Sequence, residues 1–76
     1  MYWKQHLVTS WQLENPSGIK VWLAKSLNGN HWILDIGDEN RETLPGFLSE
    51  SAAKRMAIGK TIAYLNLMIK KLERIR

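Results

Sequence analysis

The 76-residue sequence predicts an α+β fold, in which a three-stranded antiparallel β-meander is followed by one long C-terminal α-helix that packs on one face of the sheet. Three observations lead to this prediction. The first half alternates apolar and polar residues with a period of two, two turn signals interrupt the alternation, and the last third is apolar at helical spacing. At this length we expect residues 1–76 to form a single domain.

The first strand is predicted at about residues 5–14. Trp11 and Leu13 occupy alternate positions, which is the period of a strand with one buried face. An Asn-Pro-Ser-Gly segment follows at residues 15–18, and its Asn, Pro and Gly are typical of a tight turn. The chain is therefore expected to reverse here into a second strand at about residues 19–27.

A second turn signal, Asn28-Gly29, predicts a type I′ hairpin, because both central positions of that turn need positive φ. A third strand is then expected at about residues 30–36. Counting residue pairs outward from both turns places Trp11, Leu23 and Leu34 side by side in one row. A shift by one residue would turn every apolar side chain to the opposite face, so the agreement of the two turns supports the meander.

The remaining chain divides into a connector and a helix. Residues 37–48 contain Gly, Asp, Asn and Pro without periodicity, and we interpret them as a connector. Ser49 is a suitable N-cap for a helix at about residues 50–74, with Glu50 favourable in its first turn. One broad apolar stripe of this helix is expected to cover the odd-numbered face of the sheet; it consists of Ala52, Ala53, Met56, Ala57, Ala63, Tyr64, Leu67 and Met68.

A second apolar stripe on the same helix has residues spaced four, three, four and three apart, which is coiled-coil spacing. A three-stranded sheet offers one face to one helix, so this stripe lacks a partner within the domain. We interpret it as the seam of a homodimer or a docking site for another protein. The alternative is that the helix buries more of its circumference against its own sheet and connector. The seam residues are Ile58, Ile62, Leu65, Ile69 and Leu72.

The even-numbered face of the sheet is predicted to hold a second interaction surface. Trp22 lies at its centre between Gln12 and Asp35, and Lys20 belongs to the same face. A tryptophan among hydrogen-bonding groups favours protein contact, because it offers a large area at a small entropic cost. The alternative is that the connector or the N-terminal arm, through Tyr2 and Trp3, covers Trp22.

The net charge of +4 is concentrated in the C-terminal part of the chain. Residues 1–48 carry four Lys and Arg against five Asp and Glu, whereas residues 49–76 carry seven against two. Such a block can follow a phosphate backbone, but it can also be a solvated helix face that complements the helix dipole. The candidate nucleic-acid-binding residues are Lys54, Lys60, Lys70, Lys71, Arg74 and Arg76.

Other classes of site find little support in the sequence. The absence of cysteine excludes a disulfide framework and a thiolate metal site, and no apolar run is long enough to span a membrane. His6 and His31 fall on different strands without a third ligand, so we expect no metal and no cofactor. We find no nucleophile beside a base and no paired carboxylates, and therefore expect no enzymatic activity and no small-molecule substrate. A cytoplasmic location is expected.

The order of three strands and a helix from Leu7 to about Arg74 resembles, at the level of the fold, the arm-binding domains of phage integrases. This resemblance implies DNA binding through the sheet, but here Lys20 is offset by Glu14 and Asp35, and the positive charge lies on the helix. We therefore expect a small non-enzymatic regulatory or inhibitory protein, of the kind encoded by phages and mobile elements, that acts by direct protein contact as a homodimer. The alternative is a small dimeric DNA-binding protein that uses its basic C-terminal helix.

Overall fold

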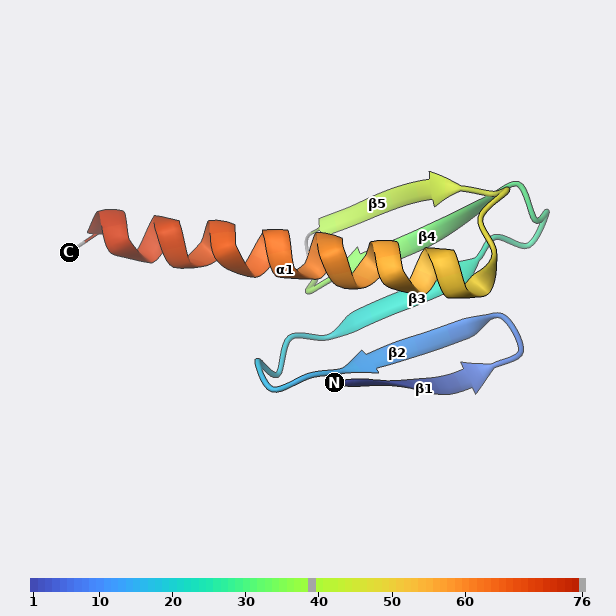
Figure 1. Cartoon of the computed structure of the whole chain (residues 1–76), viewed down its shortest axis with the longest axis horizontal. Helices are drawn as coiled ribbons and strands as arrows, with labels where there is room; N and C mark the ends of the chain where they lie inside the picture. The colour runs from blue at the N-terminus through green and yellow to red at the C-terminus, as the bar shows by residue number, and fades with distance from the viewer. Residues whose placement is uncertain (39, 76) are drawn as a thin grey trace.

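A computed structural model of the chain describes residues 1–38 and 40–75. It contains one open antiparallel sheet of five strands, with a single C-terminal helix across one face (Figure 1). Each strand pairs with the strand before it in the chain, so the sheet is a continuous meander. The predicted α+β class is confirmed, but the predicted number of three strands is wrong. The elements are β1 (Tyr2–Leu7), β2 (Ser10–Glu14), β3 (Val21–Lys25), β4 (His31–Ile36), β5 (Asn40–Pro45) and α1 (Glu50–Ile75).

One of the two additional strands comes from the segment predicted as a single strand at residues 5–14. This segment turns back at Val8 and Thr9, so β1 and β2 form a hairpin in which Trp3 pairs with Leu13. A register shift between Gln5 and Leu7 adjusts the pairing next to the turn. The prediction failed because Val8 and Thr9 are not residues that favour chain reversal, and both residue types are common within strands.

The other additional strand, β5, lies within the predicted connector at residues 37–48. Leu44 and Glu42 alternate with exposed neighbours along this strand, but only Leu44 is apolar. The Glu42 carboxylate instead accepts a hydrogen bond from the Lys60 ammonium on α1, at 3.4 Å. The strand pattern is hidden because an ion pair takes the place of an apolar contact.

The predicted register of the three inner strands is confirmed. Trp11 pairs with Leu23, Leu23 pairs with Leu34, and Val21 pairs with Ile36. These side chains lie on the helix-covered face and form the buried core together with Leu13, Trp32, Leu44, Ala53 and Ala57. The opposite face of the sheet carries no other element of the described chain (Figure 1).

The turn between β3 and β4 differs from the predicted type I′ turn. The Gly29 amide donates to the Ser26 carbonyl at 3.0 Å, which makes Leu27 and Asn28 the central residues, and of these turn residues only Gly29 has positive φ. The strand register is unchanged, because the Ser26 amide still donates to the His31 carbonyl at 2.9 Å. As a consequence Leu27 is fully exposed at the tip of the loop.

The helix packs on the sheet through Ala53 and Ala57, two small residues of the predicted stripe, and through Thr61, which was not assigned to it. Ala53, Ala57 and Thr61 are fully buried at four-residue spacing, which allows the helix backbone to approach the strands closely. The Thr61 hydroxyl is satisfied within the helix, where it donates to the Ala57 carbonyl at 2.8 Å. Met56 and Ala63, which were assigned to the covering stripe, are exposed.

The helix is much longer than the sheet that supports it. Its 26 residues span about 39 Å at about 1.5 Å per residue, whereas a six-residue strand spans about 20 Å at about 3.3 Å per residue. Figure 1 shows α1 running across the sheet and projecting well beyond the end at which β4 finishes. We call residues 62–75, which follow the last fully buried residue Thr61, the helix overhang.

Candidate interaction surfaces

The helix overhang exposes a large amount of apolar surface. Ile62, Met68, Ile69 and Leu72 leave 46%, 39%, 53% and 65% of their surfaces accessible, and Leu67 leaves 51%. So many exposed apolar side chains on one helix are unusual for a soluble monomer, which rarely exposes contiguous apolar patches larger than a few hundred Å². The overhang is therefore the strongest candidate contact surface of the described chain.

The orientation of this apolar surface follows from the helical repeat. The sheet-facing residues Ala57 and Thr61 are followed at spacings of three to four residues by Leu65, Met68 and Leu72, so these side chains extend the sheet-facing side past the end of the sheet. Ile62 and Ile69 widen the same surface on one flank. The residues that pack on the sheet and those exposed beyond it thus form one continuous stripe.

The predicted seam is divided by the structure. Ile58 packs against the core and Leu65 is half-buried, whereas Ile62, Ile69 and Leu72 are exposed on the overhang. The heptad spacing alone could not reveal this division, because it depends on where the sheet ends.

A groove of about 450 Å³ lies where the helix leaves the sheet. Tyr64, Leu67, Met68 and Lys71 line it from the helix, and Asn40 at the start of β5 closes it. Tyr64, which was assigned to the cover of the sheet, packs against the core and also lines this groove, whereas Leu67 and Met68 of the same predicted stripe are exposed.

The uncovered face of the sheet carries a row of side chains that crosses all five strands. Lys4, Gln12, Trp22, Asp35 and Arg41 occupy successive paired positions on β1 to β5. We call this row the open-face row. The predicted placement of Trp22 between Gln12 and Asp35 is confirmed. Lys4 and Arg41 were missed because their strands were not predicted.

Lys20 does not belong to the open-face row. It lies before the first residue of β3, where its carbonyl accepts a hydrogen bond of 2.7 Å from the Gly37 amide, and its side chain is exposed.

Trp22 is half-covered by a side chain from β1. The His6 ring packs against the indole in a tilted arrangement, with ring centroids 4.6 Å apart and planes at 50°. The His6 Nε2 atom also forms a hydrogen bond of 3.0 Å with Gln12 Oε1. Tyr2 and Trp3 had been considered as the cover of Trp22, but Trp3 packs against the core on the other face of the sheet, and the β1 residue that contacts Trp22 is His6.

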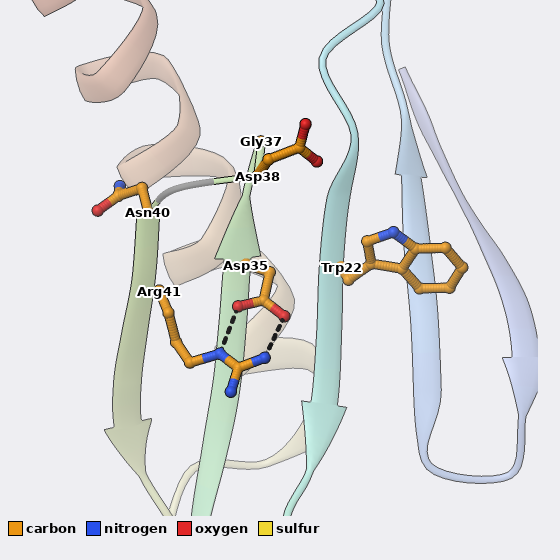
Figure 2. Close-up of a pocket in the computed structure, with 6 residues that line it drawn as sticks. All are labelled: Trp22, Asp35, Gly37, Asp38, Asn40 and Arg41. Atoms are coloured by element: carbon orange, nitrogen blue, oxygen red, sulfur yellow. Dashed lines mark hydrogen bonds and ion pairs between the residues drawn. The ribbon is translucent and has the colours of Figure 1, made fainter.

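The open-face row ends in a bidentate ion pair. The Arg41 guanidinium donates to both carboxylate oxygens of Asp35, at 2.7 and 3.0 Å. This hydrogen bonding, together with the negative charge of Asp35, raises the pKa of Arg41 above its ordinary value, so the guanidinium remains charged. Figure 2 shows the pair beside a shallow hollow of about 340 Å³, with the Trp22 ring turned away over β2 and Asp38 at the rim.

The Arg41–Asp35 ion pair forms one side of this hollow. Asp35 is held by Arg41, and the other polar side chains that line it are Asp38 and Asn40. Over residues 1–38 and 40–75, no cluster of three or more His, Cys, Asp or Glu side chains is arranged to hold a metal ion. No helix among these residues is long and apolar enough to cross a membrane.

The predicted basic residues fall into two groups. Lys54 pairs with Glu50 at 2.8 Å and lies over the Trp11 ring at 4.8 Å, while Lys60 pairs with Glu42 at 3.4 Å. In the part of the chain that the structure describes, the exposed overhang residues Lys70, Lys71 and Arg74 form no ion pair. Arg76 lies outside the described residues.

The chain was compared with protein-family models, with curated proteins and with solved structures, and none of these comparisons found a match. The helix overhang and the open-face row are therefore the features from which a function can be inferred.

Proposed function

We propose that this chain is a small regulatory or inhibitory protein that acts by direct protein contact. In this proposal two copies associate through the helix overhang, and the open-face row of each copy receives a protein partner. The observation that carries the proposal is the continuous apolar stripe that runs from the sheet-covered half of α1 onto its uncovered half.

Self-association would bury apolar side chains that are exposed on the helix overhang. Full burial of one Leu, Ile or Met side chain contributes about 1.5–3 kcal/mol. Ile62, Met68, Ile69 and Leu72 each have between 39% and 65% of their surface left to bury, and a symmetric pair contains this set twice. Burial of these side chains in both copies would contribute several kcal/mol of favourable free energy, which offsets part of the entropic cost of association.

The length of the overhang supports the same proposal. An isolated helix shorter than about 12–15 residues is marginal in water. The 14 residues at positions 62–75 extend a supported helix, which lowers their nucleation cost, but they have few tertiary contacts of their own. A second copy would supply the packing that a long helix otherwise obtains from its own domain.

The open-face row supports a protein partner for the second surface. Trp22 offers a large, rigid apolar area flanked by donors and acceptors from Gln12, Asp35 and Arg41, a combination enriched at the centres of protein interfaces. The contact of His6 with Trp22 and the ion pair of Arg41 with Asp35 order these side chains before a partner binds, which reduces the entropic cost of binding.

Self-association is tested by light scattering at about 100 μM protein, a concentration at which micromolar dimers are populated. We expect the wild type to have twice the 8.8 kDa chain mass. Leu72→Glu, which places a charge in the apolar stripe, is expected to give a single-chain mass with an unchanged circular dichroism spectrum. Asn66→Glu introduces the same residue on the polar side of the overhang and should remain dimeric. A wild type that scatters as one chain would overturn the proposal.

Nucleic-acid binding is the second candidate function, and one observation favours it. Lys70, Lys71 and Arg74 lie exposed on the last turns of α1 and form no ion pair within the described residues, so they are available to phosphates. Lys54 and Lys60 contribute less, because each already faces a carboxylate.

The nucleic-acid candidate is tested with a fluorescent duplex across a salt series. Binding through three cations predicts a slope of log K against log salt of about −2.7. A variant with Lys70, Lys71 and Arg74 changed to Ala should lose this binding. Absence of binding at low salt would eliminate the candidate.

A further inference from the structure

We infer that the second copy docks on the helix overhang in the antiparallel orientation, so that the tip of each helix reaches the end of the other copy's sheet. This inference rests on the self-association proposed above and adds the geometry of the pair. It follows from where the apolar stripe points and from the distribution of charge around it.

The position of the sheet leaves no room for a parallel partner helix on this surface. Leu65, Met68 and Leu72 point to the same side of α1 as Ala57 and Thr61, which is the side occupied by the sheet along the first half of the helix. A parallel partner helix aligned with α1 would have to pass through the space that the sheet already fills. An antiparallel partner needs only the space on the sheet-facing side of the overhang, because its own sheet then lies beyond the tip of the first helix. Figure 1 shows that the overhang extends past the sheet of its own chain.

The length of the overhang sets the register of the antiparallel pair. Thr61 is the last fully buried residue of α1, and α1 ends at Ile75, so two helices that overlap over residues 62–75 have their midpoint at Met68. In a two-fold pair Met68 therefore faces the Met68 of the other copy. Leu72 faces Tyr64 and enters the groove that Tyr64, Leu67 and Asn40 line at the end of the sheet.

The charges favour the same orientation. Lys70, Lys71 and Arg74 lie near the tip of the overhang, and the described turn residue Asp38 lies exposed at the sheet end beside which the tip of the second helix would arrive. Antiparallel pairing brings these cations toward the carboxylate. Parallel pairing would instead place the cations of both copies at the same end of the pair, where like charges repel each other.

Single cysteines test the orientation cleanly, because the natural chain has no cysteine. Met68→Cys places the thiols next to the two-fold axis, and mild oxidation is expected to link most of the chains into disulfide dimers. Leu72→Cys places the two thiols eight residues apart along an antiparallel pair, or about 12 Å, which exceeds the limit of about 7 Å between the Cα atoms of a disulfide. We therefore expect Leu72→Cys to yield almost no disulfide dimer at the same concentration.

The outcomes separate this inference from the proposed function. Cross-linking at both positions would show a parallel pair, and cross-linking of Leu72→Cys alone would also overturn the antiparallel register. If neither variant cross-links while the wild type scatters as a dimer, the copies associate elsewhere and the inference fails. If the wild type is a single chain in light scattering, the proposed self-association itself fails.

Discussion

Two glycine-to-alanine substitutions are expected to change stability in opposite directions. Gly46 lies in the loop between β5 and α1, where an added Cβ would come within 2.2 Å of the Asn30 carbonyl oxygen and 2.5 Å of its carbon. These are backbone atoms of the β3–β4 loop, so the two loops must separate by about 1 Å, at a cost of about 1–3 kcal/mol typical of overpacking. Separation would also disturb the hydrogen bond of 2.7 Å from the Lys25 ammonium to the Gly46 carbonyl.

Gly59 provides the matched control. It lies exposed in the interior of α1 with no atom within 4 Å of an added Cβ. Alanine there should stabilise the chain by about 0.5–1 kcal/mol, because glycine loses more backbone entropy in a helix.

The Tm values of both variants and of the wild type are compared by thermal unfolding, followed by circular dichroism at one protein concentration. A change of 1 kcal/mol shifts the Tm of a domain this size by about 4–8 °C. Gly46→Ala should therefore lower the Tm by about 5–20 °C, and Gly59→Ala should raise it by about 2–8 °C. A Gly46→Ala protein as stable as the wild type would refute the close packing of the two loops.

Three further substitutions test separate parts of the structure. Leu34→Ala removes a fully buried side chain from the centre of β4 and should cost about 2–5 kcal/mol in chemical denaturation; a loss below 1 kcal/mol would contradict its place in the core. Ser49→Ala removes the hydroxyl that accepts the Ala52 amide at 3.2 Å, and should cost about 0.5–2 kcal/mol with little change in helix content, whereas an unchanged midpoint would argue against this cap. Asp38→Lys should weaken the dimer in sedimentation equilibrium and more so at low salt, and a tighter dimer would disprove the charge pairing across copies.

The inner strands could be predicted from sequence because several weak signals agreed there. The apolar alternation through Trp11, Leu23 and Leu34 and the two turn segments all required the same register. The outer strands β1 and β5 lacked this agreement. β1 turns at Val8-Thr9 without a residue that favours reversal, and β5 points Glu42 toward the helix.

The exposed apolar surface of the helix could be predicted from sequence, but the rotation of the helix on the sheet could be predicted only in part. Its apolar residues predicted a surface in excess of what one sheet could cover, and the overhang is that surface. The rotation of the helix on the sheet was predicted only in part, because the buried Ala53 and Ala57 belong to the predicted stripe but the buried Thr61 does not. For the same reason Ile58 was assigned to the free seam although it packs on the core.

The open-face row was partly predictable. Trp22 and its neighbours Gln12 and Asp35 follow from the register of the inner strands. The residues that complete the surface, His6 on β1 and Arg41 on β5, come from the two strands that the pattern did not reveal.

The central claim is that another copy of the chain covers the helix overhang, and amide hydrogen exchange tests it most directly. An uncovered helix end opens locally and exchanges fast, whereas a packed one is protected up to the stability of its interface. We predict that amides of residues 66–74 become more protected as the protein concentration rises, while those of residues 53–61 stay protected throughout. Fast exchange of residues 66–74 at every concentration, beside a protected first half of α1, would contradict the account.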